Sequence, residues 1–196
     1  MKFLVLALLA IPFCWPAVPA MTYWLEPCTD RTTGCETGDV QLAEWALQSW
    51  QRELPASRSF RRVEDASNAR LQLYWATAAR GLYGEMRPIT VNGEPGAAVY
   101  VRPTLSGLGP GIEAAAQKDR LFRDTIVYLT CVHELGHAFG LRHTSDFADI
   151  MYSFQFGGDI PEYFGRFRRK LRTRSDFAAA SALAEGDRKQ LSRWRE

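Results

Sequence analysis

The sequence predicts an α+β domain, because segments with strand periodicity come early in the chain and helical segments come later. The chain has 196 residues, enough for one domain with a hydrophobic core. Hydrophobic residues make up 46% of the sequence and charged residues 23%, the composition of an ordinary globular protein. The formal net charge of +2 does not favour a protein that binds nucleic acid or a membrane surface.

The first 20 residues differ from the rest of the chain. Lys2 precedes an apolar stretch from Phe3 to Phe13, and small residues lead up to Ala20. This layout is typical of a secretory signal peptide, and we expect cleavage after Ala20. The apolar stretch is shorter than the about 20 residues that span a bilayer, so we expect no stable membrane anchor after cleavage. These features predict a secreted or periplasmic protein with residues 1–20 as its signal peptide.

Cysteine placement fits export. Cys28 and Cys35 lie in residues 21–37, which we expect to form an extended N-terminal segment stapled by a disulfide between them. Two free thiols are the alternative. Cys131 lies two residues before His133 on a predicted helix and points away from it, so we interpret Cys131 as a buried core residue.

Residues 38–196 are expected to form the main domain. Apolar residues at helical spacing predict a first helix from Asp39 to Leu54, capped by Thr37 and ended by Pro55. Period-two alternation predicts strands, with the dipeptide Asn92-Gly93 as a hairpin turn. The expected strands are residues 60–63, 69–75, 81–89 and 97–102.

The second half of the chain is predicted to be mostly helical. A loop rich in glycine and proline, residues 103–111, precedes a long helix at about 119–139. An irregular region is expected to extend to about residue 171. A last helix, at about 186–194, closes the chain.

Residues 133–143 read HELGHAFGLRH and contain the candidate metal ligands and the candidate catalytic base. His133 and His137 are four residues apart, so a helix projects both imidazoles from one face. Glu134 is rotated away from that face, yet it can reach a water molecule on a shared metal ion. This is the logic of the HExxH motif.

Gly140 and His143 extend the motif. Glycine tolerates the left-handed backbone with which many helices end, and such a turn brings His143 round as a third ligand. Three nitrogen ligands leave a fourth position open, which distinguishes a catalytic zinc site from a structural one. All three histidines of the chain lie within these residues.

The pattern HExxHxxGxxH followed by Met151 resembles the metzincin signature, with Met151 in the position of the Met-turn. Among metzincins it is most similar to the matrixins. The matching residues are Gly136, Leu141 and the run Thr144-Ser145-Asp146, and LAEGDRKQL near the C-terminus resembles the start of the last matrixin helix. Thr144 and Ser153 depart from the usual matrixin residues, and residues 154–182 resemble an insertion.

The resemblance implies a single metzincin-like catalytic domain. Its expected parts are a twisted, mostly parallel sheet with an antiparallel edge strand, a long active-site helix, a Met-turn and a C-terminal helix. It also implies a zinc endopeptidase with one catalytic zinc ion and Glu134 as general base. No histidine remains for a second zinc ion, and calcium is compatible with such a domain but not indicated. We expect a monomer that acts on peptides or proteins and binds no nucleic acid.

By the same resemblance, the substrate would lie along an edge strand that we place at residues 81–86. Tyr152, Phe154 and Phe156 are expected to help form the substrate pocket. The alternative is that the two phenylalanines are simply core residues.

Other interpretations stay open. The chain could be a zinc-binding interaction module, although Glu134 would then have no purpose, or a narrow effector with one target. The basic run at residues 165–174 could bind acidic ligands, but such a run is usually a solvated helix face. Cys28 or Asp30 could hold the enzyme latent by reaching the zinc ion, unless a disulfide occupies the thiol.

Overall fold

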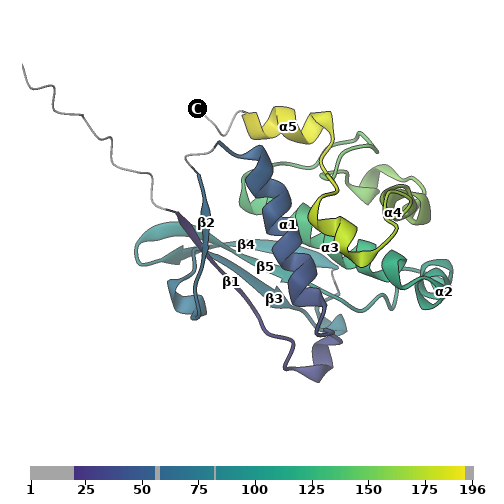
Figure 1. Ribbon diagram of the computed structural model, residues 1–196, viewed down its shortest axis with the longest axis horizontal. Coiled ribbons are helices and arrows are strands. Elements are labelled where there is room, and N and C mark those ends of the chain that lie inside the picture. The colour runs from purple at the N-terminus through teal and green to yellow at the C-terminus, as the bar shows by residue number, and fades with distance from the viewer. Residues whose placement is uncertain (1–19, 56–57, 82, 193–196) are drawn as a thin grey trace, which may run out of the picture.

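The computed structural model describes residues 20–55, 58–81 and 83–192, so the predicted signal peptide lies outside the described residues except for Ala20. The strands are β1 (Met21–Leu25), β2 (Phe60–Arg62), β3 (Leu71–Trp75), β4 (Gly84–Val91) and β5 (Glu94–Val101). The α-helices are α1 (Asp39–Glu53), α2 (Pro110–Lys118), α3 (Arg120–Ala138), α4 (Ile160–Arg168) and α5 (Glu185–Ser192). The helices gather on one side of the sheet, as Figure 1 shows.

The sheet has the strand order β2-β1-β3-β5-β4. Its pairs are parallel except for β4, which runs antiparallel to β5 at the edge. The hairpin between them turns at Asn92 and Gly93, whose φ angles are 52° and 81°. Two successive left-handed residues are what a two-residue hairpin turn requires. The predicted α+β domain with a mostly parallel sheet and an antiparallel edge strand is confirmed.

The segment at residues 21–37 differs from the extended lead-in that we expected. Met21–Leu25 forms β1, which lies between β2 and β3 and pairs in parallel with both. Tyr23 and Leu25 are buried in the core. The disulfide between Cys28 and Cys35 follows β1 and closes a loop.

Helices α1 and α3 form the layer that packs on the sheet (Figure 1). Trp50 of α1 is fully buried, and its indole N–H donates to the carbonyl of Val132 in α3 at 2.9 Å. Cys131 of α3 is also fully buried, so its interpretation as a core residue is confirmed. This packing holds α3 rigidly against the sheet, which positions the residues on its last two turns.

Three details of the helices correct the sequence-based expectations. The helix α1 starts after Gly38 without a side-chain cap, so the cap predicted at Thr37 is wrong; the Asp39 carboxylate instead accepts from the backbone N–H of Glu36 at 2.9 Å. The helix α2 begins near the end of the expected glycine-rich loop. The helix α4 interrupts the region expected to be irregular, starting at an Asp159 cap and Pro161 in its first turn.

Two arginines of the basic run at residues 165–174 form ion pairs within the protein. Arg168 contacts the Asp119 carboxylate at 2.7 Å, and Arg174 contacts Asp124 at 2.8 Å. Asp124 is fully buried, and Arg123 beside it pairs with buried Asp39. Part of the run thus anchors the C-terminal segment to α3. None of the described helices has the length and apolar character needed to cross a membrane.

Candidate metal centre and adjacent pocket

The three histidines converge at the C-terminal end of α3. The Nε2 atom of His143 lies 3.2 Å from Nε2 of His133 and 3.1 Å from Nε2 of His137. One potential ligand atom from each ring lies within 4.8 Å of the others. Nitrogen ligands at about 2.0–2.1 Å from a tetrahedral metal ion are separated by about 3.3 Å, so the rings have the spacing of a three-histidine metal site.

Backbone carbonyls orient two of the rings. Nδ1 of His133 donates to the Ile150 carbonyl at 2.7 Å, and Nδ1 of His137 donates to the Leu141 carbonyl at 2.9 Å. A carbonyl can only accept, so each Nδ1 carries the proton and each Nε2 presents a lone pair to the shared centre. A cation between the rings can accept both of these lone pairs, so the arrangement fits a metal ion.

The chain turns sharply after α3 to bring in His143, the predicted third ligand. Gly140 has a φ angle of 82°, its N–H donates to the His137 carbonyl, and the next N–H, of Leu141, donates to the Gly136 carbonyl at 3.0 Å. This double hydrogen bond with a left-handed glycine is the Schellman ending of a helix. A residue with a Cβ would be strained here, and His143 would lose its approach to the centre.

Met151 lies directly beneath α3 and is fully buried. A Cβ atom on Gly136 would lie 2.4 Å from the Met151 sulfur, so glycine at that position is what lets the methionine approach the helix. The segment returns past the third ligand, because Thr144 and Tyr152 form a β-bridge. The geometry is that of an apolar floor under the histidines.

Asp187 of α5 holds this floor in place from behind. Its fully buried carboxylate accepts from the backbone N–H groups of Ile150, Met151 and Ala184 at 2.9, 3.2 and 2.8 Å. Burial raises the pKa of Asp187 despite these hydrogen bonds. Because Ile150 also accepts the proton of His133, a chain of backbone contacts links Asp187 to the metal centre.

Glu134 lies beside the centre with only 7% of its surface exposed. Burial, with a smaller contribution from the Glu85 carboxylate, raises its pKa to about 8. Gly84 of β4 packs against the Glu134 carboxylate, and a Cβ there would lie 2.3 Å from Oε1. The edge strand thus passes directly alongside Glu134.

The surroundings favour the neutral form of two of the histidines. Burial lowers the pKa of His133 to about 4 and lowers that of His143 as well. A neutral imidazole is the form that binds a metal ion, so these shifts keep ligands available at mildly acidic pH.

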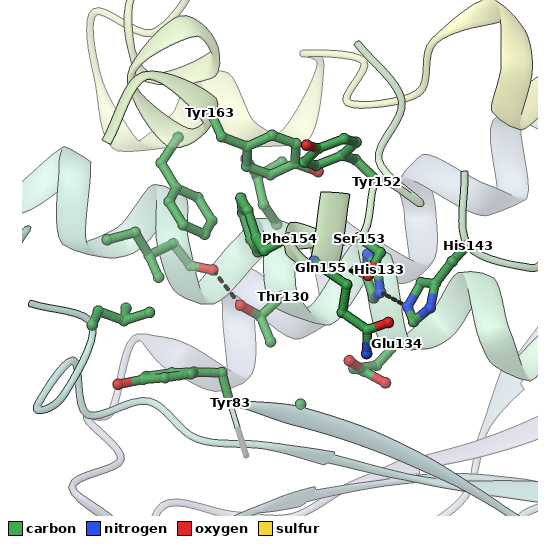
Figure 2. A pocket seen from close by; sticks show the side chains of 15 residues that line it. Tyr83, Thr130, His133, Glu134, His143, Tyr152, Ser153, Phe154, Gln155 and Tyr163 are labelled. Carbon is green, nitrogen blue, oxygen red and sulfur yellow. Dashed lines mark hydrogen bonds between the residues drawn. The ribbon is translucent and has the colours of Figure 1, made fainter. Parts of the chain in front are cut away.

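A cavity of about 270 Å³ opens next to Glu134 and His133. Figure 2 shows rings of Tyr152, Phe154 and Tyr163 on one side of it and Tyr83 on the other. The remaining lining residues away from the histidines and Glu134 are Gly84, Leu108, Ile126, Leu129, Thr130, Ser153, Gln155 and Phe164. Among the described residues that line it, Glu134 is the only acidic side chain and none is an arginine or a lysine, so the cavity beyond the metal centre is mostly apolar.

Two of the three predicted pocket residues line the cavity. Tyr152 and Phe154 line the cavity, whereas Phe156 does not and is 62% exposed. Phe154 is itself 37% exposed, so neither phenylalanine is a core residue. Phe156 points outward because it ends the short helix η4 (Phe154–Phe156), where Gly157 redirects the chain.

Several residues of the site have no sequence signal of their own. Tyr83 reaches the cavity because the Arg102 guanidinium lies 3.7 Å from its ring centroid, and both side chains donate to the Ser106 carbonyl. Tyr163 arrives on α4, and its hydroxyl donates to the Ile150 carbonyl at 3.0 Å. Asp187 could have been suspected, because it shares a helix face with buried Leu191, where an acidic residue is unusual.

The residues considered for latency are occupied elsewhere. Cys28 is in its disulfide with Cys35, so it offers no thiolate. The Asp30 carboxylate accepts from the N–H of Thr32 at 2.8 Å and caps η1 (Arg31–Thr33).

Parts of the chain are similar in sequence to known proteins. The chain is 31% identical to macrophage metalloelastase from Oryctolagus cuniculus over 121 residues, which cover 58% of this chain and 24% of that protein. It is 30% identical to matrilysin from Homo sapiens over 136 residues, covering 63% of this chain and 44% of that protein. A stretch of 59 residues is 39% identical to interstitial collagenase from Sus scrofa, covering 26% of this chain and 13% of that protein.

The chain thus spans less than half the length of these relatives. The sequence model of the matrixin family matches residues 15–159, which include the three histidines, Glu134 and Met151. This match extends over most of the chain and covers both the sheet and the metal centre. The protein belongs to the matrixin family of peptidases.

Proposed function

We propose that the protein is a zinc-dependent endopeptidase with one catalytic zinc ion held by His133, His137 and His143. The observation that carries this proposal is the convergence of three Nε2 atoms beside a buried glutamate at the edge of a sheet. When bound, zinc supplies Lewis acidity, which makes water acidic near neutral pH and polarises a carbonyl group.

Glu134 is the group that moves the proton. Its carboxylate accepts a proton from the attacking water and later donates it to the nitrogen of the departing amine. Because Glu134 is buried, its side chain can keep this proton from the bulk solvent between the two steps. Gly84 leaves the space in which the carboxylate faces the substrate.

The edge strand β4 and the cavity bind the peptide. β4 offers unpaired backbone groups for an added strand, and a side chain of the peptide enters the cavity between Tyr83 and Phe154. Because the lining is mostly apolar, we expect an apolar side chain there. We also expect charged side chains to be rejected, since Glu134 is the only charged group among the described lining residues and it is engaged in the reaction.

The place of action is proposed from two features. The disulfide between Cys28 and Cys35 fits an oxidising compartment, and residues 1–20 have the layout of a signal peptide. We propose a secreted or periplasmic monomer with protein or peptide substrates.

Hydrolysis of a broad peptide library by the zinc-loaded protein tests this function. We expect cleavage next to apolar residues by the wild type and none by Glu134→Ala, with one zinc ion bound to each. Two equally inert proteins that both bind zinc would instead identify a zinc-binding interaction module. Cleavage of one sequence only would identify a narrow effector.

A further inference from the structure

The backbone groups on the free edge of β4 determine how long a stretch of peptide can pair with this strand. Among the described strands, β4 pairs only with β5, so its other side is open. In an antiparallel pair, alternate residues direct their backbone N–H and C=O groups toward the partner and away from it. The residues whose groups point away determine what an added strand can contact.

Three hydrogen bonds fix this alternation. The Arg102 N–H donates to the Tyr83 carbonyl, so this pair faces inward. The Ala97 N–H donates to Arg70 and the Val101 carbonyl accepts from Ala76, so both residues face β3 and not β4.

The partners of those residues on β4 therefore face the free edge. Val101 is opposite Gly84 and Ala97 is opposite Pro88. By alternation, the outward residues of β4 are Gly84, Met86, Pro88 and Thr90.

The first of these residues is anchored at the catalytic end. Gly84 packs against the Glu134 carboxylate, so an added strand starts beside the base. Gly84 and Met86 each present one N–H donor and one C=O acceptor to such a strand. Pairing then extends along β4, away from the cavity that Tyr83 and Gly84 line.

Pro88 is the third outward residue, and it is exposed. Proline has no N–H to donate, and its ring occupies the place where a neighbouring strand would approach. Prolines on edge strands also discourage pairing between copies of a protein. The free edge is therefore suited to an added strand at Gly84 and Met86 and unsuited to one at Pro88.

We propose that Pro88 determines how much of the substrate the enzyme recognises, by ending the strand pairing after Met86. This rests on the proposed function, because it assumes that a peptide adds to β4. The substrate class that follows is a peptide recognised through a short backbone stretch next to the cleaved bond. Residues farther from the cavity contribute little to its affinity.

The test measures peptide binding and not turnover. Zinc-loaded Glu134→Gln protein is titrated calorimetrically with peptides that carry an apolar residue for the cavity. One series is lengthened a residue at a time at the N-terminus and a second at the C-terminus, so one of them grows along β4. The titrations are repeated with Pro88→Ala added.

The matched control is Pro95→Ala in the same hairpin. Pro95 is opposite Thr90, a residue that faces the free edge, so the nitrogen of Pro95 points away from β4. An N–H added there cannot reach a strand on the free edge.

With Pro88 present, we expect affinity to stop rising once the peptide passes Met86. With Pro88→Ala, we expect the next residues of the peptide to raise its affinity by about 3- to 10-fold, the effect of one further backbone hydrogen bond. The new amide at position 88 should also become protected from hydrogen exchange when the long peptide binds. Pro95→Ala should leave the length dependence unchanged.

An affinity that depends on peptide length in the same way with and without Pro88 would overturn the inference. So would an affinity that keeps rising past Met86 while Pro88 is present, or peptides that do not bind at all. Cleavage by the protein with Glu134 intact is measured separately. A normal binding profile without cleavage would reject the peptidase function and leave the role of Pro88 standing.

Discussion

The metal centre and the cavity beside it share α3, yet they are built in different ways. Directional hydrogen bonds fix the centre: carbonyls orient two histidine rings, and Asp187 holds the segment that provides one of those carbonyls. Packed aromatic rings form much of the cavity, with Tyr163 at 5.0 Å from Phe154 and 5.3 Å from Phe164 between ring centroids. Ring packing tolerates exchange of similar shapes, whereas a lost hydrogen bond in the centre has no substitute.

Because the two regions are built differently, we expect the chemical step and the substrate preference to be separable by mutation. Changes in the centre should remove activity or stability outright. Changes in the cavity should shift the choice of substrate by graded amounts while zinc stays bound.

The largest effect is expected for Glu134→Gln. The amide keeps the size of the side chain but cannot accept a proton, so kcat should fall by about 10²- to 10⁴-fold. Zinc content, measured by elemental analysis, should stay at the wild-type level. A variant with kcat near that of the wild type would remove Glu134 from the reaction.

A large loss of stability should follow Asp187→Asn. The amide has one acceptor oxygen, so it cannot satisfy the Ile150, Met151 and Ala184 N–H groups together. We expect the free energy of unfolding to fall by about 1–3 kcal/mol in urea titrations. The exposed Asp146→Asn is the control, and equal loss in the two variants would contradict the anchoring role of Asp187.

The pH dependence of stability should expose the buried base after zinc is removed with a chelator. The pKa of Glu134 is about 8 in the folded chain and 4.5 in its unperturbed state. Between these values the unfolded chain releases this proton and the folded chain keeps it, so Glu134 costs stability progressively as pH rises from 4.5 to 8.

Glu134→Gln should remove this cost. Relative to the variant, the free energy of unfolding of the metal-free wild type should fall by about 2–4 kcal/mol as the pH rises over that range. Denaturant titrations at successive pH values measure this difference. The pKa of His133 is lowered to about 4, so this residue destabilises both folded proteins as the pH falls. Its contribution is the same in both and cancels in the difference between them. Parallel pH curves for the two proteins would show that Glu134 is not buried as an acid.

A smaller, graded effect is expected for Phe164→Ala. Removing the ring enlarges the cavity without touching a metal ligand. We expect kcat/KM to shift by about 10-fold in favour of substrates with larger apolar side chains, comparable to the discrimination that one methylene group provides. Competition assays with paired peptides measure this ratio, and unaltered preference would show that Phe164 does not contact the substrate side chain.

The smallest effect is expected for Phe156→Ser. This side chain is 62% exposed and lies outside the cavity. Stability should change by less than about 0.5 kcal/mol, as for other surface substitutions. A change in kcat/KM as large as that of Phe164→Ala would show that substrates contact the outward face of η4.

The same contrast explains what could be predicted from the sequence. The ligands, Glu134 and the Gly140 turn lie in one short segment, where helical periodicity and backbone conformation set their relations. The cavity combines Tyr83, α3, the segment after Met151 and α4, so its composition depends on tertiary packing that no local pattern records. Phe156 was misplaced for this reason.

The fold shows a similar limit. The long helix and the hairpin at Asn92-Gly93 follow from local signals, whereas the antiparallel edge strand was implied by the resemblance to the matrixins. β1 was missed because Met21–Leu25 is a strand held by pairing on both sides. The Thr37 cap was predicted from residue type, but the buried Asp39 instead contacts Glu36 and Arg123 there.

The three-histidine centre can be tested directly by a cobalt titration of the metal-free protein, read by visible absorption, in the wild type and in three variants. The variants are His133→Ala, His137→Ala and His143→Ala. We expect one cobalt ion per chain with a tetrahedral spectrum in the wild type, and markedly weaker binding in each variant. A variant that binds cobalt as tightly as the wild type, or a wild type that binds none, would contradict the three-histidine centre.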